Sequence, residues 1–425
     1  MLVSILALIG VAFLVGVAVS LFGPWGRRPP TYQITDMPPV DSSDFLVSVA
    51  GAAGAPVRSG GTAKLLNNGV EIFPAILDAI RSAKRTVNLA AYIWEPGQVS
   101  DDLFAALTER ARAGVQIRLL LDGVGGMRAP EKEMAVLRAA GGRIEPFRPP
   151  RFGELTRFHK RNHRRALVMD GEVAFTGGVA VADKWLGDAD SPDHWRDTMT
   201  LLTGPSADTI QTAFVSLWAP VAGELLSGPE FFPRRDSRAI AGGISHVGVA
   251  SSPSNEDHPL RLFYLQSIVG ARKRLYIATP YFVPDQTVRK AVVARAHAGV
   301  DVRILLPNDY TDAKPIRLTS HRYYEELLAA GVRIFEYQPT MMHAKGMVVD
   351  GIWSVIGSAN MDIRSHELNQ ENVVGVLDAG LAEQIEAAFR EDLARSQEIR
   401  LEQWRKRGSL VRVLERAAAL FAEQY

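Results

Sequence analysis

The strongest constraint on the fold of this chain is a histidine-centred phrase that occurs twice. In both copies a basic residue stands two positions after a histidine, an Asp-Gly pair follows, and a glycine-containing turn closes the phrase. The first copy reads His163-Arg164-Arg165, Asp170-Gly171 and Gly177-Gly178-Val179-Ala180, and the second reads His343-Ala344-Lys345, Asp350-Gly351 and Gly357-Ser358-Ala359-Asn360. Repetition with the same internal spacing predicts a duplicated structural unit.

Three more pairs of similar segments precede the two phrases in the same order. The pairs are 83–92 with 271–280, 113–121 with 298–306, and 139–144 with 329–334. Within the first unit, residues 72–82 have apolar side chains at helical spacing, and residues 87–93 form a strand-like apolar run. Alternating helices and apolar strands predict an α/β fold with helices over a largely buried sheet. Two such units predict tandem α/β sandwich lobes with pseudo-twofold symmetry.

The lobe boundaries follow from composition. We expect the first lobe to span residues 62–226 and the second lobe residues 244–425, with a Pro-containing crossover at 227–243. Residues 24–61 are rich in Pro, Gly, Ser and Ala and show little periodicity, which is typical of a linker.

The amino terminus, residues 1–23, carries no charged side chain and is long enough to cross a bilayer as a helix. A cleavable signal peptide is the alternative, but such a peptide would need a basic residue before the apolar run. Arg27 and Arg28 follow the run, which favours a cytoplasmic location for the rest of the chain. We therefore expect one N-terminal transmembrane helix and a single-pass protein of the cell membrane.

Composition excludes several classes of protein. The chain has 425 residues, of which 47% are hydrophobic and 22% charged, as expected for two globular cores. Its formal net charge is only +1, which argues against a surface built throughout for nucleic acid. The absence of cysteine excludes disulfides, thiolate metal sites and cysteine nucleophiles.

The second phrase has the pattern of a β-hairpin that presents two functional side chains. Apolar residues on both sides of Asp350-Gly351 predict a strand, a tight turn and a returning strand. His343 and Lys345, two positions apart on a strand, would point to the same face. That face would offer an imidazole and a fixed cation to one phosphate.

Two such phrases make a complete phosphoryl-transfer site. One histidine can attack phosphorus, a second can protonate the leaving alkoxide, and nearby cations can neutralise the phosphate oxygens. The candidate catalytic residues are His163, Arg165, Asp170, His343, Lys345 and Asp350.

Five further residues are candidates for binding phosphate or orienting the histidines. The small residues Gly178 and Ser358 would let the backbone approach a phosphate, and Asn360 could donate its amide to a phosphate oxygen. Asp197 and Glu371 occupy matching places after the two phrases. A carboxylate on the far ring nitrogen of each histidine would fix its tautomer and stabilise the imidazolium.

The two phrases, together with three other segments, resemble the phospholipase D superfamily and especially its bacterial cardiolipin synthase branch. The other segments are Asn68-Gly69-Val70-Glu71-Ile72-Phe73, Thr279-Pro280-Tyr281-Phe282-Val283-Pro284 and Ser358-Ala359-Asn360-Met361-Asp362-Ile363-Arg364-Ser365. The resemblance extends from about residue 65 to the carboxy terminus.

This resemblance implies a single site between the lobes, with no metal and no cofactor. In the family the amino-terminal histidine usually forms the phosphohistidine, here His163, and the other, here His343, acts first as acid and then as base. The sequence itself leaves that assignment open. The implied substrate is an anionic phospholipid at a membrane: the family's synthases transfer a phosphatidyl group between phosphatidylglycerol molecules and release glycerol. Nucleic acid is not expected as a partner.

The first phrase departs from the family pattern at two positions. Arg165 stands in place of lysine, which keeps the charge but changes its shape and hydration. Ala180 stands in place of asparagine, and the loss of one such donor can cost about 10² to 10³ in rate if nothing replaces it. Further basic residues crowd around the first histidine and suit an anionic ligand: Arg157, Lys160, Arg161 and Arg164.

Two other functions remain open at this point. The same chemistry with water as acceptor would make a phospholipase, and with nucleic acid as donor it would make a nuclease, which the near-neutral charge and the apolar amino terminus disfavour. A lipid-binding protein with a degenerate first site is the third possibility. Retention of both histidines and both carboxylates argues against it.

Overall fold

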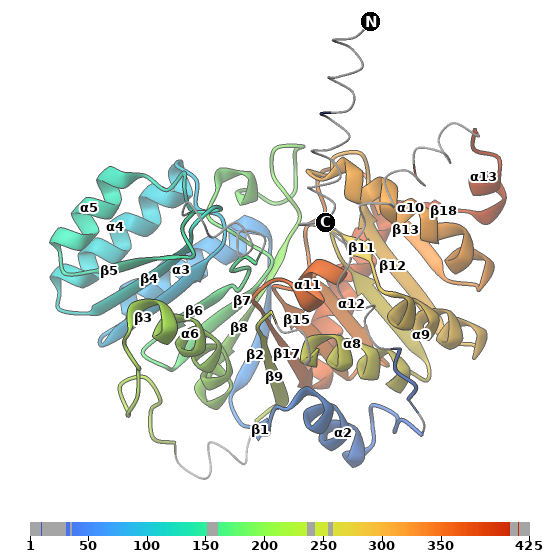
Figure 1. Ribbon diagram of the computed structural model, residues 1–425, viewed down its shortest axis with the longest axis horizontal. Helices are drawn as coiled ribbons and strands as arrows, with labels where there is room; N and C mark the ends of the chain where they lie inside the picture. The colour runs from blue at the N-terminus through green and yellow to red at the C-terminus, as the bar shows by residue number, and fades with distance from the viewer. Residues whose placement is uncertain are drawn as a thin grey trace, which may run out of the picture.

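The computed structural model describes residues 10, 31–34, 36–150, 160–235, 243–253, 258–408 and 415. Two α/β lobes lie side by side, the amino-terminal one in blue to green and the carboxy-terminal one in yellow to red (Figure 1). The prediction of tandem α/β lobes is confirmed.

The first lobe is built on a seven-stranded mixed sheet. Its strands, in spatial order, are β2 (Thr62–Asn67), β8 (Thr198–Thr203), β7 (Val173–Gly177), β6 (Ala166–Met169), β3 (Thr86–Ala91), β4 (Gln116–Asp122) and β5 (Arg143–Phe147). The last three strands are parallel and joined by helical crossovers, and the others pair in antiparallel fashion. Every residue of β3 is buried, as expected for a central strand covered on both faces.

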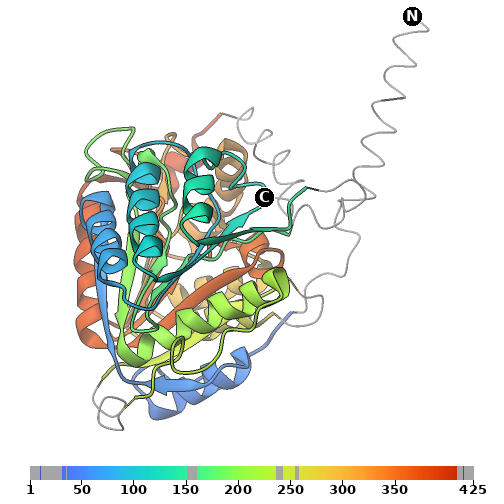
Figure 2. The ribbon, with the colours of Figure 1, turned by 90° about the vertical axis from the view of Figure 1, so that its left-hand side faces the viewer.

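Helices cover both faces of this sheet. One face carries α3 (Asn68–Ser82), α4 (Gln98–Arg112) and α5 (Glu131–Ala139), which stand next to one another in Figure 2. The other face carries α6 (Ala207–Ala222).

The second lobe repeats this order in a nine-stranded sheet. Its strands, in spatial order, are β1 (Val57–Ser59), β9 (Ser245–Ser251), β17 (Glu371–Leu377), β15 (Trp353–Gly357), β14 (Gly346–Val349), β10 (Arg274–Ala278), β12 (Asp301–Pro307), β13 (Arg333–Tyr337) and β18 (Ser396–Ile399). Without the two edge strands β1 and β18, the order matches that of the first lobe strand for strand. The hairpin predicted at Asp350-Gly351 is confirmed as β14, a turn and β15.

The second lobe has helices at the same places in the chain order as the first lobe, and two short helices in addition. They are α8 (Pro259–Gly270), α9 (Gln286–His297), α10 (Lys314–Ala329), α11 (Ile363–Glu367), α12 (Ala379–Ala394) and α13 (Leu401–Arg405). A small parallel pair, β11 (Phe282–Val283) with β16 (Met361–Asp362), lies beside the main sheet. The first lobe has a single parallel bridge at the corresponding place, between Trp94 and Val181.

The two lobes share one hydrophobic cluster. It joins α6 and strands of the first lobe to β15, β17 and α12 of the second lobe, and it includes Phe214, Trp218, Ile356, Val376 and Leu381, all of them buried. Because apolar side chains of both lobes are removed from water together, this cluster favours one fixed docking of the lobes.

Residues 24–61 differ from the linker that composition indicated. Helix α2 (Ser43–Ala53) packs on the second lobe, where Phe45 contacts Trp353 edge to face with ring centroids 5.2 Å apart. Strand β1 then pairs with β9 at the edge of the second sheet. The segment therefore crosses the second lobe before the first lobe begins.

The remaining boundary predictions fall partly outside the described residues. Among residues 1–23 only Gly10 is described, so the proposed membrane-spanning helix lies outside the described part of the chain. In that described part, no helix has the length and apolar character needed to cross a bilayer. The expected crossover at 227–243 is described only to residue 235 and at residue 243.

Candidate active site

The two histidines lie at the junction of the lobes, and each is paired with a carboxylate of the opposite lobe. His163 Nδ1 is 2.9 Å from Glu371 Oε1, and His343 Nδ1 is 2.7 Å from Asp197 Oδ2. Both carboxylates are fully buried. The site is therefore complete only when the lobes are docked.

Backbone hydrogen bonds across the junction hold each histidine next to the carboxylate of the opposite lobe. The His163 amide donates to the carbonyl of Gln370 at 2.9 Å, and the His343 amide donates to the carbonyl of Arg196 at 2.7 Å. Asn162 and Met342, which directly precede the two histidines, thus form short parallel bridges with Gln370 and Arg196, which directly precede the opposite carboxylates. The same arrangement occurs on both sides of the pseudo-twofold axis.

A lysine and two tryptophans surround His343. Lys345 Nζ lies 3.1 Å from Nδ1 and 3.2 Å from Nε2 of the imidazole, and it donates to the His343 carbonyl at 3.0 Å. The rings of Trp185 and Trp195 lie 5.3 and 5.5 Å from the imidazole. The expectation that His343 and Lys345 share a face agrees with these contacts, although both residues precede β14 rather than belonging to it.

Arg165 repeats the lysine contact in the first lobe. Its Nη1 donates to the His163 carbonyl at 2.6 Å, as Lys345 does to its own histidine. Tyr92 lies edge to face with His163 at 5.1 Å, and the Arg165 guanidinium lies 5.9 Å from the Tyr92 ring. The arginine thus keeps a buried positive charge beside the first histidine.

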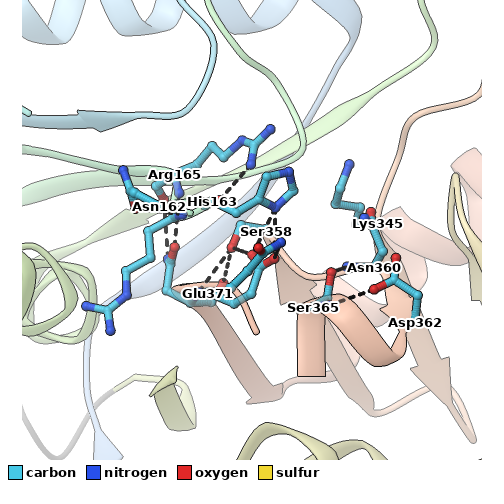
Figure 3. Close-up of polar contacts among 12 residues, drawn as sticks. Asn162, His163, Arg165, Lys345, Ser358, Asn360, Asp362, Ser365 and Glu371 are labelled. Carbon is cyan, nitrogen blue, oxygen red and sulfur yellow. Dashed lines mark hydrogen bonds and ion pairs between the residues drawn. The ribbon is translucent and has the colours of Figure 1, made fainter. Parts of the chain in front are cut away.

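The two carboxylates are held by different donors. Ser358 Oγ donates to Glu371, and Figure 3 shows both beneath the His163 ring. Asp197 accepts from Trp185 Nε1 at 2.8 Å and from the Thr198 amide at 2.7 Å.

Gly178 occupies the place in the first lobe that Ser358 occupies in the second. A Cβ at Gly178 would lie 2.2 Å from Asp197 Oδ1. The glycine therefore makes room for the carboxylate that the serine hydroxyl would otherwise meet.

Burial and neighbouring charges set the protonation states. Burial, aided by Arg165, lowers the pKa of His163 to about 4 against the opposing effect of Glu371. Burial and then Lys345 lower the pKa of His343 to about 4. Burial lowers the pKa of Lys345 itself to about 7. At neutral pH both imidazoles are thus neutral.

The carboxylates remain ionised in this environment. Burial opposes the charge of Asp197, but His343, Lys345 and the Thr198 amide together keep the pKa of Asp197 below its usual range. His163 and Ser358 do the same for Glu371. Each imidazole therefore faces a fixed negative charge through Nδ1, which leaves Nε2 for chemistry.

Asp170 and Asp350 do not lie with the histidines. Both occupy hairpin turns with positive φ, and both accept backbone amides, of residues 84–86 and 272–274 respectively. Each follows its histidine by seven residues, which is about 23 Å of fully extended chain. The structure corrects their place among the candidate catalytic residues: they hold the hairpins onto the strands that carry the site.

Two arginines of the predicted basic cluster bond to backbone carbonyls of the protein. Arg164 is buried and donates to the carbonyls of Ala213 and Ser251, and Arg161 donates to the carbonyl of Arg148. These two arginines hold the chain around His163 in place, so they are not free to bind an anion. Lys160 is half-buried, and Arg157 lies outside the described residues.

The two phrases close differently. Asn360 is buried, its Oδ1 has no hydrogen-bond partner among the described residues, and Figure 3 shows it beside Lys345. Ala180 instead packs in the apolar core of the first lobe. The second phrase thus ends in a side-chain amide near the site, whereas the first phrase ends in a methyl group.

Sequence reasoning missed three residues that build the site. Trp185 supports Asp197, and Asn372 joins the lobes by bonding to the backbone of Arg165 and to Thr176. Arg196 is clamped by Asp392 of α12. Asn372 could have been suspected because it directly follows Glu371, but the other contacts depend on lobe docking.

Comparisons with known proteins agree with the geometry. A family described as "Cardiolipin synthase, PLD-like domain" matches residues 76–218 and 264–393. The chain belongs to this family. It is similar to cardiolipin synthase 2 of Bacillus anthracis, with 34% identity over 83% of this chain and 68% of that protein. It is also 34% identical to the cardiolipin synthase of Geobacillus thermodenitrificans, over 86% of this chain and 73% of that protein. The resemblance seen in the sequence is confirmed.

Solved structures with low sequence identity share the fold of this chain. The phosphatidylserine synthase of Haemophilus influenzae superposes with a TM-score of 0.68 over 89% of this chain and 97% of that chain, at 15% identity. A polyphosphate kinase of Porphyromonas gingivalis gives a TM-score of 0.53 over 80% of this chain and 49% of that chain, at 13% identity. Identities this low support the tandem-lobe fold alone.

The protonatable side chains of the described residues form no cluster suited to a metal. No group of three or more His, Asp or Glu side chains in this part of the chain could hold a metal ion.

Proposed function

We propose that this protein is a membrane-anchored cardiolipin synthase, which transfers a phosphatidyl group from one phosphatidylglycerol molecule to a hydroxyl of another. Relatives of this family at 34% identity are named cardiolipin synthases. The observation that carries the proposal is the pair of buried histidines, each with a carboxylate from the opposite lobe and a cation of its own. Binding alone would not need two such oriented imidazoles.

In the first half-reaction His163 is the nucleophile. Its Nδ1–H donates to Glu371, so the lone pair on Nε2 attacks phosphorus. The bond from phosphorus to the glycerol oxygen breaks, and protonated His343 gives its proton to that oxygen. Glycerol leaves, and the phosphatidyl group is held on His163 as a phosphohistidine whose positive charge faces Glu371.

In the second half-reaction His343 acts as a base. Neutral His343 takes the proton of the acceptor hydroxyl, whose oxygen attacks phosphorus while the phosphorus–nitrogen bond to His163 breaks. Cardiolipin leaves, and both histidines return to their starting states.

The two cations of the site, Lys345 and Arg165, stabilise negative charge on the phosphate oxygens. Lys345 and Arg165 are buried, so their charges act in a region of low polarisability on the oxygens that become more negative in each transition state. Binding of a phosphodiester anion next to His343 favours its protonated form and prepares it to act as the acid.

The membrane anchor is the apolar run at residues 1–23. A single span followed by Arg27 and Arg28 would keep the two lobes at the cytoplasmic surface, where the lipid substrate is in reach. The full chain should sediment with phosphatidylglycerol vesicles, and a chain beginning at residue 31 should sediment far less.

The decisive experiment incubates purified full-length protein with phosphatidylglycerol vesicles and identifies the products by mass spectrometry. We expect cardiolipin and glycerol from the native protein, and none from His163→Ala or His343→Ala. Phosphatidic acid as the sole product would make the protein a hydrolase. No turnover of any phosphodiester would overturn the proposal.

A further inference from the structure

A third carboxylate lies close to the His343 side of the site. Asp312 is in the loop that follows β12, and its side chain is exposed, unlike those of Asp197 and Glu371. Its Oδ1 accepts a hydrogen bond from the Tyr281 hydroxyl at 2.6 Å. Neither histidine pairs with it.

Tyr281 connects this carboxylate to the second histidine phrase. Thr279 Oγ1 donates to the Tyr281 carbonyl at 2.9 Å and accepts the amide of Met361 at 3.2 Å. Met361 directly follows Asn360, which lies beside Lys345 (Figure 3). The Tyr281–Asp312 pair is therefore fastened to the segment that closes the second phrase.

The charge of Asp312 acts on the second histidine and its lysine. Burial lowers the pKa of both His343 and Lys345, and Asp312 is among the anions that oppose this shift. Burial and then Asp312 raise the pKa of Tyr281 well above its usual range, so its hydroxyl stays protonated and keeps donating.

A carboxylate at this place is unfavourable for a phosphate and needs another explanation. Among the residues that the structure describes, Asp312 has no ion-pair partner. A phosphate oxygen offers no proton to it and would be repelled by it. A cationic head group beside His343 would be repelled by Lys345, whose Nζ lies 3.1 Å from the imidazole Nδ1. A hydroxyl group suits both neighbours, because it can donate to the carboxylate without adding charge.

The pair offers two acceptors next to each other. With the Tyr281 proton on Oδ1, the second carboxylate oxygen and the phenolic oxygen remain free to accept. Two hydroxyls on neighbouring carbons could donate to them at the same time. A simple alcohol would fill only one of the two positions.

We propose that Asp312 and Tyr281 bind the hydroxyls of the glycerol head group and so select a polyol as the alcohol that leaves and enters beside His343. This inference rests on the proposed transfer to an alcohol, and it adds the two residues that determine which alcohol is bound.

The test is a competition between acceptors. Native protein and Asp312→Asn are incubated with phosphatidylglycerol vesicles and equal concentrations of deuterated glycerol, 1-propanol and ethanolamine, and the phosphatidyl products are quantified by mass spectrometry. Asparagine keeps an oxygen for Tyr281 but loses the charge, and hydrogen bonds to charged groups exceed those to neutral groups by an amount that corresponds to roughly tenfold. We expect the glycerol-to-propanol ratio to fall about tenfold.

A matched control is Asp309→Asn. Asp309 lies in the same loop, is 90% exposed and pairs with Arg317 rather than with Tyr281. This variant should keep the native glycerol-to-propanol ratio. An equal loss of both products in Asp312→Asn would reduce Asp312 to a loop-holding residue and overturn the proposal. So would a native preference for ethanolamine that Asp312→Asn abolishes, because the carboxylate would then select a cation.

A second measurement separates this proposal from the proposed function. Glycerol should inhibit the native hydrolysis of a soluble p-nitrophenyl phosphodiester, and its inhibition constant should rise about tenfold in Asp312→Asn. That readout needs no transfer to lipid. Native protein that makes no cardiolipin but shows this inhibition would refute the synthase and keep the polyol site. Synthesis of cardiolipin with identical glycerol inhibition in both proteins would support the synthase and refute the polyol site.

Discussion

Replacing Asp197 by Asn should disable the acid and base of the site while sparing its nucleophile. The carboxylate of Asp197 accepts from His343 Nδ1 at 2.7 Å, from Trp185 Nε1 at 2.8 Å and from the Thr198 amide at 2.7 Å. An asparagine turns one of the two oxygens into an NH2 group. In either orientation that group faces at least one N–H, so a buried donor loses its acceptor.

The magnitude follows from these contacts. A hydrogen bond to a charged group contributes about 1.5–3 kcal/mol, which is equivalent to about 10- to 150-fold in an equilibrium. The amide also lets the imidazole settle in the wrong tautomer, and the same exchange in a catalytic triad lowers kcat by about 10⁴. We therefore expect Asp197→Asn to lower kcat for cardiolipin synthesis by about 10² to 10⁴.

The assay that locates the defect uses a donor whose leaving group needs no proton. With phosphatidyl-p-nitrophenol, Asp197→Asn should release one equivalent of p-nitrophenol in a fast burst and then turn over slowly, because His343 is still needed as the base. Glu371→Gln, which alters the partner of His163, should lose the burst. Thermal unfolding of both variants shows whether the lobes are intact.

Two results of the burst assay would contradict this prediction. If Asp197→Asn lost the burst and Glu371→Gln kept it, the nucleophile would be His343 and the assignment of roles would be reversed. If both variants lost the burst equally, the carboxylates would not act through separate histidines.

Three further predictions concern charge, space and packing. Because the pKa of Lys345 is lowered to about 7, its cation is present below that pH and lost above it; kcat/KM should fall as the pH rises through 7, and Lys345→Arg should move this limb upward. Gly178→Ala places a methyl group 2.2 Å from the carboxylate behind it and should lower kcat at least 100-fold, whereas Gly346→Ala, whose added Cβ would meet nothing closer than 3.9 Å, should stay within twofold. Phe45→Ala should cost about 3–5 kcal/mol in urea unfolding, and Val47→Ala, at a position 67% exposed, less than 0.5 kcal/mol.

Local pattern was enough to foresee the repeated units. Residues 87–93 were recognisable as a strand because a continuous apolar run is what a doubly covered sheet requires, and most of this run lies in β3. The hairpin at Asp350-Gly351 followed from turn chemistry, since both residues have positive φ there. Phosphoryl transfer could be predicted because each histidine and its cation are only two residues apart in the sequence.

Contacts between distant segments could not be foreseen. Residues 43–59 have the composition of a linker, yet the second lobe supplies an apolar face and an open sheet edge that order them as α2 and β1. The matching positions of Asp197 and Glu371 suggested one carboxylate for each histidine, but only the docked lobes decide which belongs to which. Asp170 and Asp350 were misplaced because repetition in both phrases does not reveal whether a side chain turns toward the site or toward the backbone.

The exchange of carboxylates between the lobes has a consequence for how this enzyme could have diversified. In a symmetric dimer of single-phrase subunits, every substitution would appear on both sides of the axis, and the two histidines would have identical surroundings. Joining both halves in one chain removes that restriction. Arg165 can differ from Lys345, and Gly178 from Ser358, so that the two imidazoles need not have identical surroundings. Covalent linkage thus permits a division of labour that an assembly of identical copies would forbid.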